Sequence, residues 1–307
     1  MRYPFVTAAK IFLDAYSGVY SEGMWAELHR RYPKIARQLE HLETKGKIST
    51  TNPSKLTPVD IKEYVVYQRS RGLKPTSISH DICAISTLCI FTSNNNCVDV
   101  ARVRYPILFP HRPNKRLPVT ERPEFDRILK FASVLTTVSD PLRIRCYAET
   151  LFAYGTGPRT QELQHAKYKF LDNDCVSVFF DHVKGGDSYG QCRTVPVRPE
   201  VRPTLQLWMS IRNSDSVYLF PNKDGGFLST NSLTKDRNVV CNDTGISFDY
   251  RKCRRTYAQY LIDEGLSVEK LAVILGHSNS KTTEKSYARP RDDRVVAEVI
   301  NSWSEKK

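Results

Sequence analysis

Residues 251–258 read Arg-Lys-Cys-Arg-Arg-Thr-Tyr-Ala, and the chain then continues to a histidine at 277 and a tyrosine at 287. Arg251 and Arg254 are three positions apart, so a helix places both guanidinium groups on one face. Such a face binds a phosphate well, because each guanidinium forms charge-assisted bonds to phosphoryl oxygens. His277 can exchange a proton, and the Tyr287 hydroxyl can act as a nucleophile. The stretch therefore predicts phosphoryl transfer that needs neither a metal nor a cofactor.

Between these polar residues, apolar side chains recur at helical spacing, at Tyr257, Leu261, Val268, Leu271, Ile274 and Leu275. The pattern predicts helices that carry the basic cluster on one side and pack into a core on the other. Tyr257 and Tyr260 belong to the apolar side, so we expect them in the core and not as nucleophiles.

A further candidate phosphate ligand lies upstream, in the segment Tyr-Gly-Thr-Gly-Pro-Arg-Thr-Gln-Glu of residues 154–162. Its glycines end one helix, and its proline suits the first turn of the next. Arg159 is then expected at a helix N-terminus, where backbone N–H groups already favour an anion. The alternative is a structural arginine that pairs with its own Glu162, three positions further on.

Two short strands are predicted in the same half of the chain. Residues 174–180 alternate and are rich in β-branched and aromatic side chains, and residues 193–197 read Arg-Thr-Val-Pro-Val. Lys184 lies in the connection between them, followed by two glycines. From the sequence alone, an exposed hairpin lysine usually only solubilises a strand edge.

Repeated prolines mixed with arginine and lysine at 104–118 exclude a continuous helix and mark a boundary. We expect a helical domain at 1–103, a basic extended linker at 104–118 and a second domain at 119–307. The fold class is mainly α with a small β-hairpin or sheet (α+β). Taken alone, the first domain could be any helical interaction module.

Within these domains, residues 5–50 read as helical, with Pro33 able to kink or split the helix. Thr57 before Pro58 is a strong helix start, and another helix is expected from Pro75. In the second domain, Thr120 and Glu124 predict a capping pair at a helix start. Asp140 before Pro141 predicts another helix start. Residues 222–236 predict a loop, followed by a short helix.

The 307-residue chain has a net charge of +13 and a pI of about 9.3. Its length allows two domains with separate cores, and its basic balance favours an acidic polymer as partner over a merely solvated basic surface. The chain has no apolar run long enough to cross a membrane and no signal-peptide core at its start, so a cytoplasmic location is expected. Its eight cysteines form no C-x-x-C pair, and we expect reduced, buried thiols, for example at Cys83 and Cys89.

The order of these motifs resembles the catalytic domain of tyrosine recombinases, the phage-integrase family, including Xer enzymes and integrases of archaeal viruses. That family's pattern is Arg, Lys, His-x-x-Arg, His or Trp, and Tyr. The resemblance assigns catalytic roles to six residues, namely Arg159, Lys184, Arg251, Arg254, His277 and Tyr287. "LTPVDIKEYV" and "GLKPTSISHDICAISTLCIF", from residues 56–91, likewise resemble the family's core-binding domain.

Two positions depart from the family pattern. Arg251 stands where a histidine is usual, and it can bond a phosphate oxygen but cannot act as a base near neutral pH. Tyr287 follows His277 by ten positions (287 − 277), one more than usual, and Ser286 occupies the expected place.

The resemblance implies a site-specific recombinase or integrase of double-stranded DNA, from a mobile element, a virus or a chromosome-resolution system. It acts through a 3′-phosphotyrosyl intermediate, with Lys184 protonating the leaving 5′-oxygen. It also implies a homotetramer on two DNA sites, in the cytoplasm or nucleoid, or in the host cytoplasm if a virus encodes it. The apolar helix expected at 294–304 then docks on a neighbouring protomer, and the alternative is that it packs on its own domain. The alternatives are a type IB topoisomerase-like enzyme and a catalytically decayed recombinase that only binds DNA.

Overall fold

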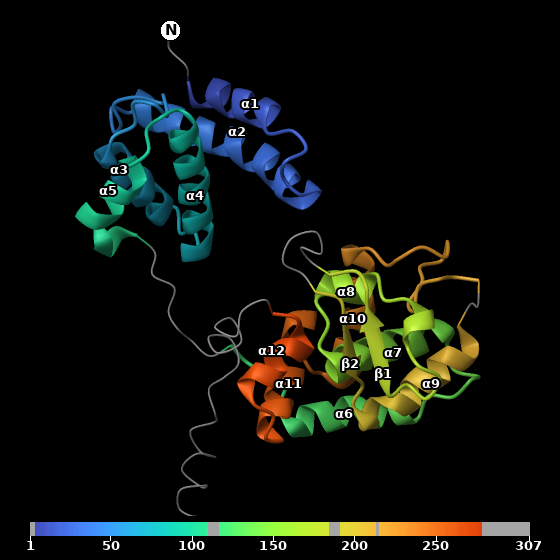
Figure 1. Cartoon of the computed structure of the whole chain (residues 1–307). Coiled ribbons are helices and arrows are strands. Elements are labelled where there is room, and N and C mark those ends of the chain that lie inside the picture. Colours follow the sequence, from blue (N-terminus) through green and yellow to red (C-terminus); the bar gives the residue numbers. More distant parts are fainter. Residues whose placement is uncertain (1–3, 110–116, 184–190, 213–214, 278–307) are drawn as a thin grey trace, which may run out of the picture. The chain divides into compact units, whose positions relative to one another are not determined.

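The computed structural model describes residues 4–109, 117–183, 191–212 and 215–277. The chain forms two compact units, residues 1–114 and 115–307, and each is described by itself (Figure 1). No helix within the described ranges is long and apolar enough to span a membrane.

Unit 1 is a bundle of helices around one apolar core. Its elements are α1 (Phe5–Ala15), α2 (Glu22–Thr44), α3 (Pro58–Ser70), α4 (Pro75–Phe91), α5 (Cys97–Arg104) and the short 3₁₀ helix η1 (Pro106–Leu108). Both α1 and α4 pack on α2, while α3 packs against α5. The core is formed mainly by large side chains of the three longest helices, among them Tyr32, Ile35, Leu39, Ile61, Tyr64, Ile82 and Ile85.

The predicted helix starts of unit 1 are confirmed. The Thr57 hydroxyl accepts a hydrogen bond from the backbone N–H of Asp60 at 3.3 Å, and the Asp60 carboxylate accepts one from the backbone N–H of Thr57 at 2.8 Å. This reciprocal pair is a capping box, which satisfies two backbone donors that the first turn of α3 leaves unpaired. Helix α4 begins at Pro75, as predicted.

Unit 1 differs from the sequence-based expectation in two places. Residues 5–50 form two helices with a break at 16–21, and α2 runs through Pro33 without ending there. The start of the predicted extended linker is folded, because α5 continues to Arg104 and Phe109 is buried against the core. Pro106 stands in the first turn of η1, a position that suits proline, so this proline does not prevent a helical turn here.

Unit 2 is built around α7 (Pro141–Thr156), with a two-stranded antiparallel sheet beside it. Twelve of the sixteen residues of α7 are buried, so the helix is covered on all sides and forms the centre of the unit. Strand β1 (Ser177–Phe180) pairs with β2 (Arg193–Pro196), and Val178 lies opposite Val195. Both strands were predicted. Around α7 lie α6 (Arg122–Ser133), α8 (Thr160–Gln164), α9 (Arg202–Ile211), α10 (Thr230–Thr244), α11 (Tyr250–Asp263) and α12 (Val268–Leu275), with the short η2 (Tyr168–Phe170) and η3 (Pro199–Val201) between them.

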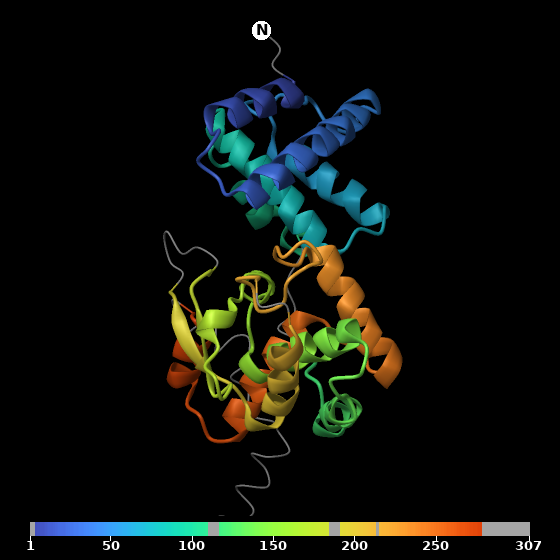
Figure 2. The ribbon, with the colours of Figure 1, turned by 90° about the vertical axis from the view of Figure 1, so that its right-hand side faces the viewer.

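Strand β2 contacts both α7 and α12. Figure 1 shows β2 on the side of the hairpin nearer to α12, with β1 on its other side. Figure 2 shows α10 along the outside of the unit, where it packs on α6, α7 and α8. The end of α7, the start of α8, the strand β2 and the end of α12 therefore meet in one region.

Three smaller predictions for the chain are wrong. Helix α6 is capped by Glu121, whose backbone N–H donates to Glu124 at 3.1 Å, because the Thr120 hydroxyl is instead hydrogen-bonded to Tyr154 in the core. Helix α10 already begins at Thr230, inside the predicted loop, where Ser229 caps it. Cys83 is exposed; all eight cysteines are free thiols, and Cys89 is buried as expected.

Candidate active site

The turn between α7 and α8 places Arg159 at the edge of the site. Gly157 ends α7 with a φ of +61°, a conformation that favours glycine. A Cβ atom at this position would lie 2.5 Å from Cδ1 of Tyr257 on α11, so glycine is also the residue that allows the two helices to approach. Arg159 then occupies the position before the first turn of α8, as the sequence predicts.

Glu162 on α8 is the common partner of three arginines. Its side chain is fully buried. One oxygen, Oε1, accepts from Arg159 Nη1 at 2.7 Å, and Arg193 donates to both oxygens at 3.0 and 2.8 Å. Arg254 Nη1 lies 3.7 Å from Oε2. The pairing of Arg159 with its own i+3 glutamate is therefore present, but within a larger cluster that joins α8, β2 and α11.

Arg254 and Arg159 both reach the end of α12, next to His277. Arg254 donates through Nη2 to the Leu275 carbonyl at 2.7 Å, and the same nitrogen lies 3.2 Å from His277 Nε2. Arg159 Nη2 donates to the Gly276 carbonyl at 2.9 Å. Three of the predicted site residues, distant in the sequence, thus lie together in unit 2.

The charge of this cluster is unbalanced. Among the residues that the structure describes, three guanidinium groups face one carboxylate, which gives this cluster a net charge of +2 (3 − 1). Burial of Glu162 raises the pKa of its carboxyl, but the hydrogen bonds and charge of Arg193 outweigh burial, and with Arg254 and Arg159 they lower that pKa to about 2. Glu162 is therefore ionised at any ordinary pH, and the excess positive charge favours an anion.

His277 is neutral at physiological pH. Partial burial lowers the pKa of its imidazole, and the charges of Arg254, Arg159 and Arg193 lower it further, to about 4, against a smaller opposite effect of Glu162. A guanidinium can only donate, so His277 Nε2 accepts from Arg254 and the ring proton lies on Nδ1. This imidazole can donate a hydrogen bond without carrying a charge.

Arg193 was not among the predicted site residues. The sequence assigned it to the second strand only, where its neighbours alternate between buried and exposed positions. Its side chain points to the buried side and is 7% exposed. An arginine in an inward position of a strand is the signal that could have identified it, because arginine is rarely buried without a carboxylate partner.

Arg251 lies one helical turn before Arg254 on α11 and is exposed. It lines a hollow of about 180 Å³ together with Thr160, the residue after Arg159, and with Arg237 and Asp249. Its position thus allows contact with an anion bound beside α8. Two predicted site residues, Lys184 and Tyr287, and the expected helix at 294–304 lie outside the described residues.

The sequence is similar to those of known proteins. Residues 119–294 match the phage integrase family. The tyrosine recombinase XerC of Erythrobacter litoralis is 30% identical over 193 residues, which cover 61% of this chain and 61% of that protein. The tyrosine recombinase XerA of Pyrococcus furiosus is 25% identical over 231 residues, which cover 74% of this chain and 75% of that protein.

Solved structures show the same fold. The Tn1549 transposon integrase in complex with transposon right end DNA matches with a TM-score of 0.72 at 17% identity, over 97% of this chain and 99% of that one. The XerH site-specific recombinase bound to palindromic difH matches with a TM-score of 0.68 at 16% identity, over 91% of this chain and 80% of that one. Since the family match covers more than half of the sequence, the chain belongs to the phage integrase family of tyrosine recombinases.

Proposed function

We propose that this chain is a site-specific recombinase that cuts and rejoins double-stranded DNA through a 3′-phosphotyrosyl intermediate. The observation that carries the proposal is the convergence of Arg159, Arg254 and His277 around one ionised carboxylate with excess positive charge. Such a cluster suits the binding of a phosphodiester and the stabilisation of the additional negative charge of its transition state.

The proposed reaction transfers one phosphoryl group twice. The Tyr287 hydroxyl attacks the phosphorus atom and loses its proton to water, and the bond to the 5′-oxygen of the DNA breaks. Lys184 protonates that oxygen, so a free 5′-hydroxyl and a 3′-phosphotyrosine result. A 5′-hydroxyl of another strand then attacks the phosphotyrosine and gives its proton to the neutral Lys184, while the tyrosine leaves and regains a proton from water. The bond energy is conserved throughout, and the scheme uses no cofactor.

Each basic group has a distinct proposed part in this scheme. Arg159 and Arg254 bind the non-bridging oxygens, and exchange part of their carbonyl contacts for phosphate when DNA is present. His277 donates from Nδ1 to the same phosphate. Arg251 supplies an additional positive charge from the exposed side, where a base is not required.

The surface next to the site supports a nucleic acid as partner. A hollow of about 450 Å³ is lined by Arg237, Lys252 and Arg255 together with Asp249. It shares Arg237 and Asp249 with the smaller hollow that Arg251 lines. A basic surface that continues beyond one phosphate suits a polyanion. The Tn1549 integrase and XerH were solved with DNA. We extend the proposal to a homotetramer on two DNA sites in the cytoplasm or nucleoid, assembled through the helix expected at 294–304.

A covalent-capture experiment tests the function. The full chain is incubated with a pool of nicked duplexes of random sequence, in which the cut fragment diffuses away, and complexes that resist detergent are isolated and sequenced. We expect a selected target sequence, a DNA adduct on Tyr287 by mass spectrometry and no adduct with Tyr287→Phe. An adduct that persists with Tyr287→Phe would show that the nucleophile is assigned wrongly.

Two alternatives are distinguished by this experiment together with an assay on supercoiled plasmids that carry the selected sequence. Specific binding by the wild-type chain without any covalent complex would identify a decayed recombinase that acts as a DNA-binding protein. A covalent complex that relaxes supercoiled DNA but never joins two sites would identify a type IB topoisomerase-like enzyme.

A further inference from the structure

We propose that Arg193 is a positioning residue of this site. It fixes the distance between Glu162 and the end of α12, and so keeps Arg159, Arg254 and His277 in fixed positions relative to one another. The inference rests on the proposed function, since it concerns the geometry of the same phosphate site. Because Arg193 is the first residue of β2, the inference gives this strand a part in positioning the site residues.

Three successive carbonyls at the end of α12 each accept a hydrogen bond from a different arginine. Ile274 accepts from Arg193 Nε at 2.7 Å, Leu275 from Arg254 at 2.7 Å and Gly276 from Arg159 at 2.9 Å. The last carbonyls of a helix have no partner within the helix and carry its negative end, so cations are favoured there. All three arginines also contact Glu162. Each arginine therefore links the Glu162 carboxylate to one carbonyl at the end of α12.

Arg193 donates to the protein through every nitrogen of its guanidinium. Its Nε donates to Ile274, and Nη1 and Nη2 donate to the two oxygens of Glu162. Its side chain is 7% exposed, as is that of Arg254, compared with 27% for Arg159. Since every guanidinium nitrogen already donates to the protein, Arg193 is not placed as a phosphate ligand. What it can do is keep the ligands in position.

The Arg193 guanidinium also packs closely against two neighbours. Its Cζ lies 5.4 Å from the centre of the Phe180 ring on β1. A Cβ atom at Gly276 would lie 2.8 Å from Arg193 Nη1. Gly276 also has a φ of +64°, which favours glycine and directs the chain toward His277. The guanidinium therefore occupies the space that a side chain at 276 would need.

A lysine could not replace this arrangement. The planar guanidinium donates in three directions at fixed angles, whereas an ammonium group is a compact charge that cannot reach both oxygens of Glu162 and the Ile274 carbonyl together. Arg193→Lys thus keeps the positive charge of the cluster but loses the simultaneous hydrogen bonds to Glu162 and Ile274. The variant therefore separates the effect of positioning from the effect of charge.

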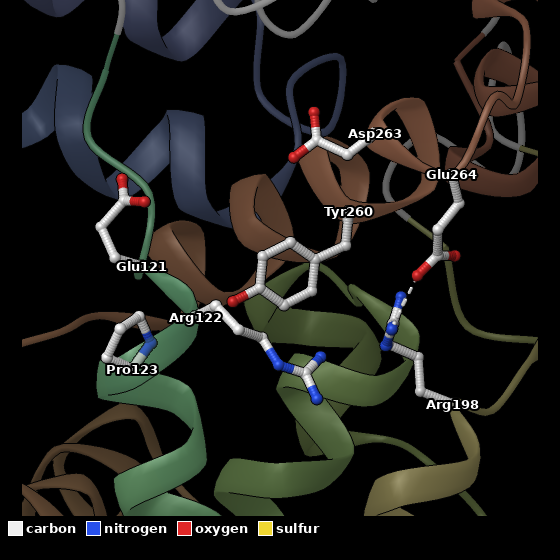
Figure 3. Close-up of a pocket in the computed structure, with 7 residues that line it drawn as sticks. All are labelled: Glu121, Arg122, Pro123, Arg198, Tyr260, Asp263 and Glu264. Atoms are coloured by element: carbon white, nitrogen blue, oxygen red, sulfur yellow. Dashed lines mark hydrogen bonds and ion pairs between the residues drawn. The ribbon is translucent and has the colours of Figure 1, made fainter. Parts of the chain in front are cut away.

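The test compares Arg193→Lys with Arg198→Lys as a matched control. Arg198 follows the same strand, pairs with Glu200 and Glu264 at 2.9 and 2.8 Å, and is 10% exposed. Figure 3 shows it beside Tyr260 and paired with Glu264, in a separate pocket of about 370 Å³. The two substitutions therefore make the same chemical change at two arginines of similar burial, 7% and 10% exposed, only one of which belongs to the cluster around Glu162.

We expect Arg193→Lys to slow formation of the covalent complex on a selected nicked duplex about 100-fold, because a displacement of about 1 Å in a catalytic group has an effect of this size. DNA affinity should stay within threefold of wild type, and Arg198→Lys should cleave at the wild-type rate. A rate for Arg193→Lys within threefold of wild type would overturn the inference, as would an equal loss in Arg198→Lys. If wild type forms no adduct, the proposed function fails instead.

Two further measurements keep the inference testable. If Arg193→Lys does not fold, Phe180→Leu removes the ring beneath the guanidinium and should slow cleavage about 10-fold with the fold intact; no slowing would contradict a positioning role. The pKa of His277, followed by NMR without DNA, should be higher in Arg193→Gln than in wild type, because the variant removes a nearby positive charge that lowers this pKa. An unchanged pKa would show that Arg193 does not act on His277.

Discussion

Removal of the Glu162 carboxylate tests the energetics of the site most directly. In the folded chain its pKa is about 2, compared with 4.5 for an ordinary glutamate, because Arg193, Arg254 and Arg159 outweigh the effect of burial. Each pKa unit corresponds to about 1.4 kcal/mol, so the shift of 2.5 units (4.5 − 2) contributes roughly 3 kcal/mol to the free energy of unfolding at neutral pH. The side chain is fully buried, so solvent screening does not reduce this figure.

The sign of the pH dependence follows from the lowered pKa. The contribution is complete above about pH 4.5, where Glu162 is ionised in both states, and it is lost as the pH falls toward 2. We expect Glu162→Gln to lower the free energy of unfolding by roughly 3 kcal/mol at pH 7, and the difference from the parent to narrow to about 2 kcal/mol at pH 3.5.

Urea unfolding of the full chain measures this difference. Trp208 is buried in unit 2 and donates to the Leu219 carbonyl, so its fluorescence in a Trp25→Phe/Trp303→Phe background reports on that unit. The loss should lower the unfolding midpoint by about 1 to 2 M urea. As control, Glu264→Gln removes a 53% exposed partner of Arg198 and should cost less than about 1 kcal/mol. Equal losses in the two variants, or a Glu162→Gln difference that does not narrow below pH 4.5, would refute the reasoning.

Two further predictions concern the residues around this carboxylate. His277 should titrate by NMR with a pKa of about 4, so that its ring is neutral from pH 6 upward; a protonated ring at pH 6 would contradict the effect ascribed to burial and to the three arginines. Gly157→Ala should lower the thermal midpoint of unit 2 by well over 5 °C, because a Cβ atom would lie 2.5 Å from Tyr257 in a strained φ region, whereas Gly245→Ala, with a φ of +70° and open space around it, should lower it less.

The parts of the fold that depend on local chemistry could be predicted from the sequence. Thr57, Pro75 and Asp140 mark helix starts because capping and the fixed φ of proline act within a few residues. The two strands followed from their alternation. The position of Arg159 at a helix start followed from the glycines and the proline before it.

Features that depend on contacts between distant segments could not be predicted in the same way. Thr120 looked like a helix cap, but its hydroxyl is bonded to Tyr154, 34 positions away. Arg193 looked like an ordinary strand residue, and its importance appears only when Glu162 and Ile274 are seen on either side of it. The catalytic roles of Arg159, Arg251, Arg254 and His277, and those of Lys184 and Tyr287, stay predictions that the covalent-capture experiment tests.

The sharing of one carboxylate by three arginines has a consequence for the newly made protein. Arg159, Arg193 and Arg254 span 95 positions (254 − 159), and the helix end that they contact is made later still. A nascent or partly unfolded molecule therefore lacks the assembled cluster. In the proposed function, such a molecule cannot yet cleave DNA.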